Sequence, residues 1–428
     1  MRVVIVSESF PPDVNGVAHC AEQTARHLVR RGHAPLVIAP AVPGPGAPSA
    51  FSADSPVHAV PAPLPEPVGP GTGPHGPRSG RSRLAVYGSG RRAGGEGPAV
   101  PAGDGPTYPV VRVPSVPLPG YPQVRVALPS RRVAAAIAAH RPDIVHLASP
   151  FVLGARGMAA AARLGLPAVA VYQTDLAGYA RTYMGTGEAA AWRRLRAVHG
   201  AADRTLAPST AAVRDLEAHG VGRVRIWRRG VDTDRFRPAL RDEALRRELA
   251  PGGELLVGYV GRLAPEKRVE LLSGLCALPG VRVVVVGDGP SEPGLRAALP
   301  GAVFLGRRTG PDLARIFASL DVFAHTGPYE TFCQTVQEAM ASGVPVVAPA
   351  AGGPLDLVEH RRTGLLVPPD DAAALRDAVA SLAGAPALRA AFARAGRAEV
   401  EGRTWEAVGD ELIGHYLEVL RERTAVAA

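Results

Sequence analysis

Cysteines and long apolar runs are scarce in this sequence. Three cysteines occur in 428 residues, far apart and without the spacing of a disulfide framework or a metal-ligand motif. They are Cys20, Cys276 and Cys333. No uninterrupted apolar run reaches the roughly 18 residues that indicate a membrane-spanning helix. The run 3–6 ends in Ser7 and Glu8, so it predicts a buried first strand instead of a signal peptide. These features predict a protein of the reducing cytoplasm.

Lysine and aromatic residues are scarce as well. Lys267 is the single lysine among 48 basic residues, and aromatics make up 5% of the chain. Without a stripe of interleaved basic and aromatic residues, we expect no nucleic-acid partner. The formal charge of +9 would suit a peripheral position on an anionic membrane surface. Because arginine and lysine are not interchangeable, Lys267 is a candidate for a role that needs a compact point charge.

The length and the alternation of strands and helices predict an α/β protein with two Rossmann-like domains and a deep interdomain cleft. We expect the first domain at 1–230 and the second at 231–405. A C-terminal helix at 406–428 is expected to pack back toward the first domain. Residues 41–106 interrupt the first domain: 28 of these 66 residues are Pro or Gly. We therefore expect a flexible insertion there.

Apolar periodicity and capping residues predict the elements of each domain. In the first domain the expected strands are 2–7, 36–39, 110–113, 144–147, 168–172 and one that ends at 206, and the expected helices are 17–31, 130–140, 154–164, 189–201 and 210–219. In the second domain the expected strands are 255–260, 281–286, 303–305, 322–324, 344–348 and 365–367, and the expected helices are 266–277, 332–342, 371–383, 386–400 and 405–422.

Two cations follow the predicted strand 255–260. Arg262 and Lys267 lie five residues apart, after the carboxyl end of a strand, where ligands bind in folds of this class. A nucleoside diphosphate carries concentrated negative charge, which Arg262 can bind with two parallel hydrogen bonds and Lys267 as a point charge. The alternative is a solvated basic loop that leads into a helix.

Two glutamates, Glu330 and Glu338, are separated by seven residues at the start of the predicted helix 332–342. Eight helical residues advance about 12 Å and turn about 80° beyond two full turns, so the two carboxylates would face broadly the same side. Glu330 could accept hydrogen bonds from a sugar and Glu338 from ribose. Backbone amides of 331–333 could bind phosphate at the helix N-terminus. The alternative is an acidic helix start followed by a solvated glutamate.

Other segments give weaker signals. Gly16, before the first long helix, would let the backbone approach a ligand closely. His146 lies near the end of the predicted strand 144–147, and the polar run 173–175 follows the predicted strand 168–172. Ligand sites gather at such strand ends, although a lone histidine there is more often structural. Asp232-Thr233-Asp234 mimics a metal-binding motif, but its position suggests an interdomain hinge, and we predict no metal site. No G-x-G-x-x-G follows the first strand, which argues against a nicotinamide enzyme.

Together these motifs resemble glycosyltransferase family four, whose fold is called GT-B. The resemblance covers nearly the whole chain outside 41–106. The resemblance is most detailed with bacterial GDP-mannose-dependent alpha-mannosyltransferases that act on glycolipids. The segments that carry this finer similarity are 7–17 (SESFPPDVNGV), 146–150 (HLASP), 172–175 (YQTD) and 330–334 (ETFCQ).

The resemblance implies a metal-independent retaining hexosyltransferase that needs no bound cofactor. Its donor would be a nucleotide sugar, with GDP-mannose the best guess, and its acceptor a lipid or glycan. A UDP-sugar donor and a nucleotide-sugar epimerase on the same fold remain alternatives. The catalytic residues implied are Arg262, Lys267, Glu330 and His146. The donor site implied adds Gly16, Thr331, Phe332, Cys333 and Glu338. The acceptor side implied is Asn15, Gln173 and Asp175.

Overall fold

The computed structural model describes residues 1–13, 15–42, 107–118, 121–149, 151–175, 177–178 and 187–427. The predicted insertion at 41–106 lies outside the described residues except for Ala41 and Val42, so its flexibility stays a prediction. Val14 and Pro150, which belong to two of the motifs, also lie outside them. All described residues belong to one compact unit, and the domain boundaries at 230 and 405 stay a prediction.

The first half of the chain forms a seven-stranded parallel sheet in the order β3-β2-β1-β6-β7-β8-β9. Its strands are β1 (Arg2–Val6), β2 (Ala34–Pro40), β3 (Val110–Val113), β6 (Ile144–Leu147), β7 (Ala168–Val171), β8 (Arg204–Ala207) and β9 (Val224–Ile226). Its helices are α1 (Gly16–Arg30), α2 (Arg132–His140), α3 (Val152–Arg163), α5 (Glu188–Ala201) and α6 (Thr210–Ala218). An antiparallel hairpin of β4 (Ser115–Leu118) and β5 (Tyr121–Ala127) was not predicted.

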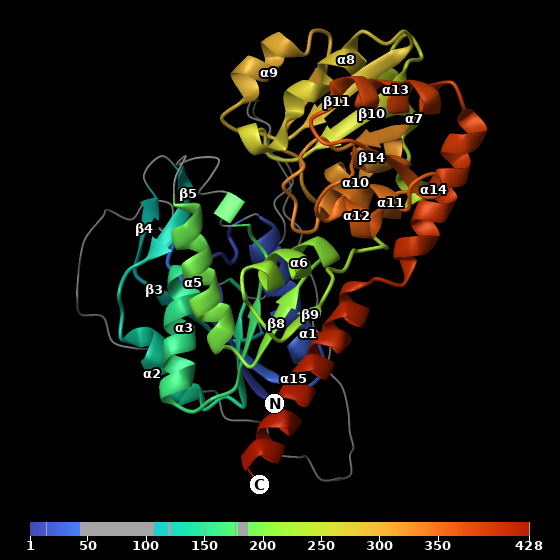
Figure 1. Cartoon of the computed structure of the whole chain (residues 1–428). Coiled ribbons are helices and arrows are strands. Elements are labelled where there is room, and N and C mark those ends of the chain that lie inside the picture. The colour runs from blue at the N-terminus through green and yellow to red at the C-terminus, as the bar shows by residue number, and fades with distance from the viewer. Residues whose placement is uncertain are drawn as a thin grey trace, which may run out of the picture. The chain divides into compact units, whose positions relative to one another are not determined.

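The second half forms a six-stranded parallel sheet in the order β12-β11-β10-β13-β14-β15 (Figure 1). Its strands are β10 (Leu255–Val260), β11 (Val281–Val286), β12 (Val303–Gly306), β13 (Val322–Ala324), β14 (Val346–Pro349) and β15 (Gly364–Val367). Its longer helices are α7 (Glu243–Leu249), α9 (Glu292–Ala298), α10 (Gly310–Ser319), α11 (Gln334–Ala341), α13 (Ala372–Ala383) and α14 (Pro386–Glu401). Its short helical turns are η1 (Pro238–Leu240), η2 (Pro265–Lys267), η3 (Val269–Leu272), α8 (Ser273–Cys276) and α12 (Pro354–Leu357).

Both sheets have the strand order of a doubly wound fold, in which the chain reverses its direction of travel beside the first strand. The reversal lies between β1 and β6 in the first sheet and between β10 and β13 in the second. The predicted fold class is therefore confirmed. In such sheets ligands bind beyond the carboxyl ends of the strands at the reversal point. We therefore expect a site in the loops that follow β1, β6, β10 and β13.

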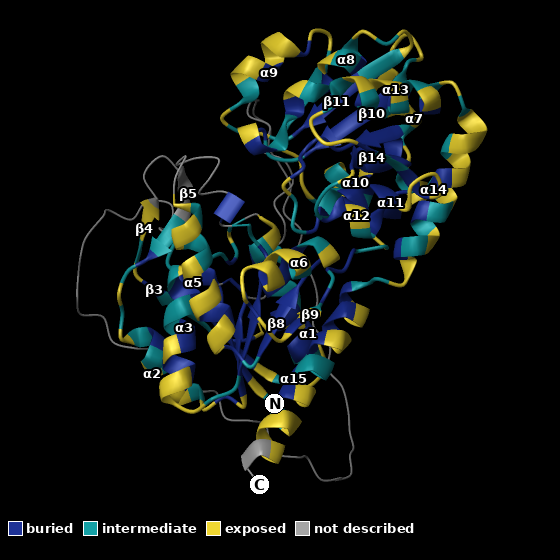
Figure 2. Ribbon diagram, viewed as in Figure 1, coloured by how far each residue is buried: buried dark blue, intermediate teal, exposed yellow. Residues whose placement is uncertain are grey.

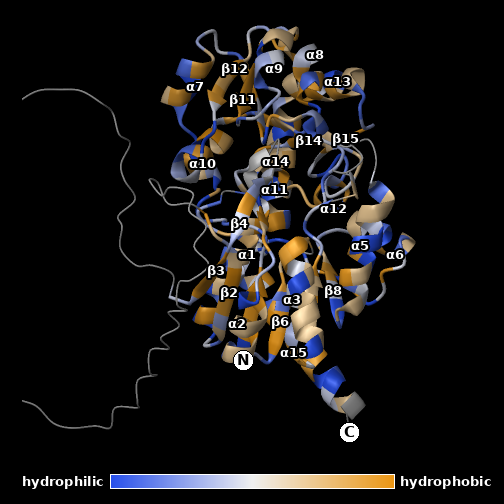
Figure 3. Cartoon of the chain, turned by 90° about the vertical axis from the view of Figure 1, so that its left-hand side faces the viewer, coloured by the Kyte–Doolittle hydropathy of each residue, from blue (hydrophilic) through white to orange (hydrophobic). Residues whose placement is uncertain are grey.

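The strands are nearly continuous runs of valine, isoleucine and leucine because both faces of each sheet are covered. Figure 2 shows central strands such as β8, β10 and β14 as buried, and Figure 3 shows strands such as β2 and β6 as hydrophobic. Successive residues point to opposite faces. Val3 and Ile5 accordingly join one buried cluster and Val4 and Val6 another.

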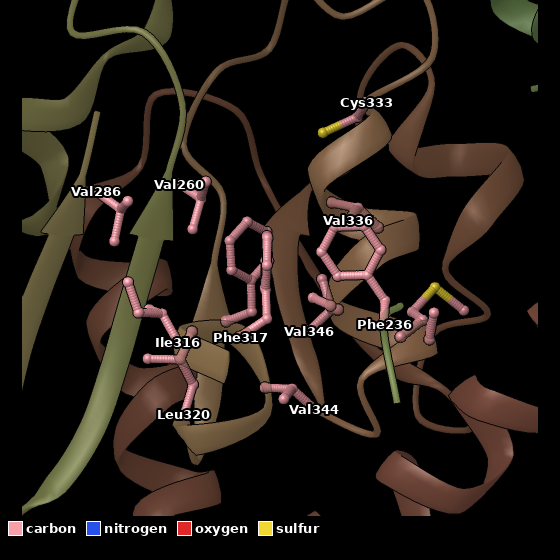
Figure 4. Packing of buried hydrophobic residues seen from close by; sticks show 14 of the residues in the cluster. Phe236, Val260, Val286, Ile316, Phe317, Leu320, Cys333, Val336, Val344 and Val346 are labelled. Carbon is pink, nitrogen blue, oxygen red and sulfur yellow. The ribbon is translucent and has the colours of Figure 1, made fainter. Parts of the chain in front are cut away.

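The second sheet is packed in the same way. Val260 and Val286 lie in one cluster, and Tyr259 and Val285 lie in the cluster on the opposite face. Figure 4 shows Val260 and Val286 beside Phe317 and the valines of α11 and β14. This packing anchors α11 against the sheet, and the motif that precedes α11 is held with it.

The last helix, α15 (Trp405–Ala427), packs on the first sheet. Its apolar side chains, among them Leu412 and Tyr416, belong to the buried cluster that contains Val3 and Ile5. The indole nitrogen of Trp227 donates a hydrogen bond to the carbonyl of Val408 at 2.9 Å. Among the described residues, we found no helix with both the length and the apolar character needed to cross a membrane.

The predicted helix 266–277 is wrong. The chain instead forms η2, η3 and α8, with Arg268 in the left-handed region at a φ of 51°. The hydroxyl of Thr326 donates to the carbonyl of Lys267 at 2.6 Å. A continuous α-helix would use that carbonyl for the amide of residue 271, which here bonds to Arg268 instead. A tertiary contact therefore takes a hydrogen bond that the local pattern assigned to a helix.

Candidate active site

Residues with ionisable side chains gather at the reversal point of the second sheet. Arg262 and Lys267 lie in the segment after β10, and His325 follows β13 directly. Glu330 lies in the loop between β13 and α11, and Cys333 is the residue before α11. Parallel strands end at one edge of the sheet, so segments far apart in sequence meet there.

Lys267 and Glu330 form the central ion pair of this group. Nζ of Lys267 lies 2.6 Å from Oε1 of Glu330, and the side chains are only 17% and 18% exposed. Nε2 of His325 lies 3.4 Å from the same oxygen. Burial by itself raises the pKa of Glu330, but attraction to Lys267 and the bond to His325 outweigh it and hold that pKa well below its ordinary value. Glu330 is therefore a carboxylate at neutral pH.

His325 is held in its charged form by its neighbours. Burial alone lowers its pKa, whereas interactions with Cys333 and Glu330 raise it to about 10. Its Nε2 also contacts the carbonyl of Gly327 at 3.1 Å. Ligand atoms of His325, Glu330 and Cys333 all lie within 4.8 Å of one another. His325 was not predicted from the sequence, although a polar residue directly after an apolar strand was the available signal.

Arg262 is fixed by its own neighbour in the chain. A guanidinium nitrogen of Arg262 donates to the carboxylate of Glu266, which is buried. The loop that carries Arg262 packs directly on the loop after β11. A Cβ at Gly287 would lie 1.8 Å from the carbonyl oxygen of Gly261, and φ at Gly287 is +144°. Only glycine fits that approach, which holds the Arg262 loop in place.

The motif of two glutamates does not lie on one helix, and the prediction that both carboxylates share a helical face is wrong. Helix α11 begins at Gln334, and Cys333 before it has a φ of 76° in the left-handed region. Glu330 is therefore in a loop and only Glu338 is helical. Glycines after β14 support that loop: the carbonyl of Glu330 accepts a hydrogen bond from the amide of Gly353 at 2.7 Å.

Glu338 has the opposite electrostatic character from Glu330. Burial raises its pKa to about 8, and the charge of Arg235 and a hydrogen bond from Gln334 offset that only in part. Its carboxyl is therefore largely protonated at neutral pH. A protonated carboxyl both donates and accepts hydrogen bonds, which suits a pair of hydroxyl groups.

Comparison with known proteins identifies the family of this chain. The family model described as "Glycosyltransferase Family 4" matches residues 93–235, and that of "Glycosyl transferases group 1" matches residues 241–399. A protein of Mycobacterium tuberculosis named GDP-mannose-dependent alpha-mannosyltransferase is 45% identical over 100% of this chain and 99% of its own length. One of the same name from Corynebacterium glutamicum is 37% identical over 98% of this chain and 89% of its own. The chain belongs to glycosyltransferase family four.

Solved structures agree with the GT-B fold of this glycosyltransferase. Sucrose-phosphate synthase from Thermosynechococcus elongatus superimposes with a TM-score of 0.72 at 19% identity, over 99% of this chain and 100% of its own. Anabaena HepE in complex with UDP gives a TM-score of 0.69 at 20% identity, over 98% of this chain and 100% of its own. The enzyme is a hexosyltransferase, and its donor is a nucleotide sugar.

Arg229 connects several predicted residues of the glycosyltransferase, and the sequence analysis missed it. A nitrogen of its buried guanidinium donates to the side-chain oxygen of Gln173 at 2.9 Å. The guanidinium carbon lies 6.0 Å from the ring centre of Phe332. A Cβ at Gly16 would lie 2.7 Å from Arg229. The feature of the sequence that could have indicated Arg229 is the pair Arg228-Arg229 after β9. That strand was not predicted.

Further hydrogen bonds join this neighbourhood to the loop before α11. The hydroxyl of Thr331 donates to the backbone carbonyl of Gln173 at 3.0 Å. Side chains of α11 donate to the segment that holds Arg229: Gln337 bonds the carbonyl of Arg229 at 3.1 Å and Gln334 that of Gly230 at 3.0 Å. The structure thus brings Gly16, Gln173 and the 331–332 segment of the glycosyltransferase together around one arginine.

Three predicted residues of the glycosyltransferase have structural partners. Asn15 caps α1 by accepting hydrogen bonds from the amides of Val17 and Ala18. Asp175 accepts a hydrogen bond from the amide of Gly178 at 2.8 Å. His146 is buried in the core of the first sheet, and its Nδ1 lies 2.6 Å from the hydroxyl of Tyr416 on α15. Burial lowers the pKa of His146 to about 3. These contacts favour packing for His146, and its catalytic role stays a prediction.

Proposed function

We propose that this chain is a retaining mannosyltransferase that takes mannose from GDP-mannose and transfers it to a lipid or glycan acceptor. The main observation that supports this proposal is the Lys267–Glu330 ion pair at the reversal point of the second sheet. It occurs in a chain that is 45% identical, over its full length, to proteins named GDP-mannose-dependent alpha-mannosyltransferase. The donor identity rests on those relatives, and the residue roles rest on the geometry.

Arg262 and Lys267 are proposed to bind the donor diphosphate. Both follow β10, and their side chains are 30% and 17% exposed, so their charges lie in a partly desolvated environment. Electrostatic attraction to phosphate is stronger there than in bulk water. The negative charge on the diphosphate grows as the sugar leaves, so these cations stabilise the transition state more than the ground state.

Glu330 and Glu338 are proposed to bind the two sugars of the donor. Glu330 is ionised and can accept hydrogen bonds from the hydroxyls of the transferred hexose. Glu338, with a pKa near 8, can both donate to and accept from ribose hydroxyls. The amides of Thr331, Phe332 and Cys333 precede α11, whose N-terminal dipole favours a phosphate.

The proposed reaction proceeds on one face of the sugar. The bond between the anomeric carbon and the diphosphate breaks, and a bond to the acceptor oxygen forms on the same face. The acceptor proton passes to the departing phosphate oxygen, which acts as the base, so no side chain must take it. Configuration at the anomeric carbon is retained, and no metal ion is needed, because Arg262 and Lys267 supply the positive charge.

Residues of the first sheet are proposed to form the acceptor side. Gly16 and Gln173 meet at Arg229, whose guanidinium carries a buried positive charge beside Phe332. A hydroxylated acceptor can use the polar groups of Gln173, and the formal charge of +9 favours an anionic membrane surface as the place where a lipid acceptor is met.

Thermal unfolding with candidate nucleotides tests the donor. Ligand at 100 times its Kd stabilises the native state by about 2.7 kcal/mol. We expect GDP and GDP-mannose to raise the Tm in the absence of metal, and UDP and ADP to leave it unchanged. A rise with UDP compounds alone would overturn the GDP-mannose assignment, and no rise with any of them would contradict the donor site.

A pair of variants tests the proposed site. Lys267→Ala should remove the Tm rise with GDP and lower turnover by about 10²–10³-fold, as loss of one electrostatic contact to developing charge typically does. Arg268→Ala is the matched control, because Arg268 is the next cation in the chain and pairs with Glu270 and Asp370. It should keep both properties. Equal behaviour of the two variants would contradict the proposed role of Lys267.

A further inference from the structure

Three side chains of different chemistry converge beside the Lys267–Glu330 ion pair. They are the imidazole of His325, the carboxylate of Glu330 and the thiol of Cys333, whose ligand atoms all lie within 4.8 Å of one another. His325 is 2% exposed and Cys333 is 4% exposed. The proposed function uses Glu330 for the sugar and gives no task to the nitrogen and sulfur beside it.

The combination of ligands is selective. Nitrogen, oxygen and sulfur donors together suit zinc and similar thiophilic cations, whereas magnesium and calcium prefer oxygen ligands alone. His325 and Glu330 already approach to 3.4 Å. Two ligands of a tetrahedral zinc ion lie about 3.4–3.6 Å apart, so the three side chains need to converge by only about 1 Å. Three protein ligands leave a fourth position open.

The imidazole of His325 faces Glu330 through one ring nitrogen. Its Nε2 contacts the carbonyl of Gly327 at 3.1 Å and lies 3.4 Å from Oε1 of Glu330. Its other ring nitrogen, Nδ1, is buried and has no hydrogen-bond partner among the described residues. Coordination through Nε2 therefore replaces its contact with Gly327 by a bond to the ion.

Positive charge nearby limits which ions can enter. Lys267 contacts Oε1 of Glu330 at 2.6 Å, so an ion must compete with its ammonium group for this carboxylate. A cation that binds mainly through charge and oxygen gains little against that competitor. A thiophilic cation gains bonds to sulfur and nitrogen as well. Coordination by His325 requires a neutral imidazole, so binding releases its proton to solvent.

We propose that His325, Glu330 and Cys333 form a site for a thiophilic divalent cation, with zinc the best match, and that occupancy of this site blocks donor binding. The site is inhibitory because it takes Glu330 from the sugar and displaces Lys267 from its position toward the diphosphate. The inhibitory part rests on the proposed function, whereas the coordination itself does not.

Cobalt titration of the full chain tests the coordination without any measurement of turnover. With Co²⁺ as the probe, we expect one equivalent to give the near-ultraviolet thiolate-to-cobalt absorption and the visible bands of a four-coordinate ion. Zn²⁺ should displace it. Cys333→Ser should lose the thiolate band, and Cys276→Ser, a matched change at a half-buried cysteine of α8, should keep it. A thiolate band that survives in Cys333→Ser, or no band in the wild type, would overturn the site.

Competition with GDP tests the inhibition. Zn²⁺ should weaken GDP binding to the wild type and to Cys276→Ser at least tenfold, and Cys333→Ser should need at least tenfold more Zn²⁺ for the same effect. Thermal unfolding of each variant without metal checks that it is folded. If the cobalt band stands but Zn²⁺ leaves GDP affinity unchanged, the link between this cation site and the donor site is overturned. If GDP binds neither the wild type nor the variants in the absence of metal, the proposed function fails while the coordination result stands.

Discussion

The ammonium group of Lys267 lies 2.6 Å from a carboxylate oxygen of Glu330, across a sequence separation of 63 residues. It is the only lysine in the chain, and it pairs with the first glutamate of the two-glutamate motif. The ion pair thus joins the two motifs that were recognised separately in the sequence. It also places a compact point charge beside Glu330, which a planar guanidinium does not reproduce.

The first prediction concerns the stability that this ion pair provides. Lys267→Met should lower the free energy of unfolding at pH 7 by about 3 kcal/mol, because it leaves a largely buried carboxylate without its main partner. The double variant Lys267→Met/Glu330→Gln should recover part of that loss, since no uncompensated charge remains. Urea unfolding of both single variants and the double variant measures the coupling. If the two single effects simply add, the residues are not energetically coupled.

The second prediction is a pH dependence that originates in Glu338. Its pKa is raised from 4.5 to about 8 in the folded state, so folding binds a proton that the unfolded chain releases between these values. The free energy of unfolding should therefore fall as pH rises from 4.5 through about 8, by up to about 1.4 kcal/mol for each pH unit. Glu338→Gln should flatten this slope and weaken GDP binding.

Glu217→Gln, on the exposed side of α6, is the matched control for Glu338→Gln and should change neither property. The measurement is urea unfolding at a series of pH values between 5 and 8.5, about the range over which Glu338 changes charge. An unchanged slope in Glu338→Gln would show that another group is responsible for the dependence.

The third prediction concerns Gly16. A methyl group there would approach the guanidinium of Arg229 to 2.7 Å and force it to move, although Arg229 is bonded to Gln173. Gly16→Ala should lower kcat/KM by about 10–100-fold while it changes stability little, because a misplacement of about 1 Å in a site has that effect on rate. Gly200→Ala, in a helix with no atom within 4 Å of the new Cβ, is the control and should keep full activity. If Gly16→Ala is as active as Gly200→Ala, Gly16 has no role in the site.

The fourth prediction separates a packing role of His146 from a catalytic one. Tyr416→Phe removes the hydroxyl that lies 2.6 Å from Nδ1 of His146 and leaves a buried nitrogen unbonded. We expect a loss of about 1–2 kcal/mol in the free energy of unfolding and nearly unchanged turnover below the new Tm. A large loss of kcat with little loss of stability would instead support the catalytic role implied by the family resemblance.

The sequence by itself determined the two doubly wound halves and most of the strands along the chain. Strand runs such as 255–260 and 281–286 are apolar because both faces are buried, and local composition records that burial. The sequence also located the cations after β10 and the two glutamates before and within α11. These features depend on residues close together in the chain, so a pattern can reveal them.

Only the tertiary structure decided how these residues meet. Cys333 adopts a left-handed conformation that removes Glu330 from α11, and the glycines after β14 pack beneath that loop. His325 and Arg229 join the site through segments whose ends are distant in sequence, and His146 lies in the core against Tyr416 of α15. Local patterns report the hydrogen bonding and burial of one segment. The convergence of side chains depends on where several loops end, which packing between segments determines.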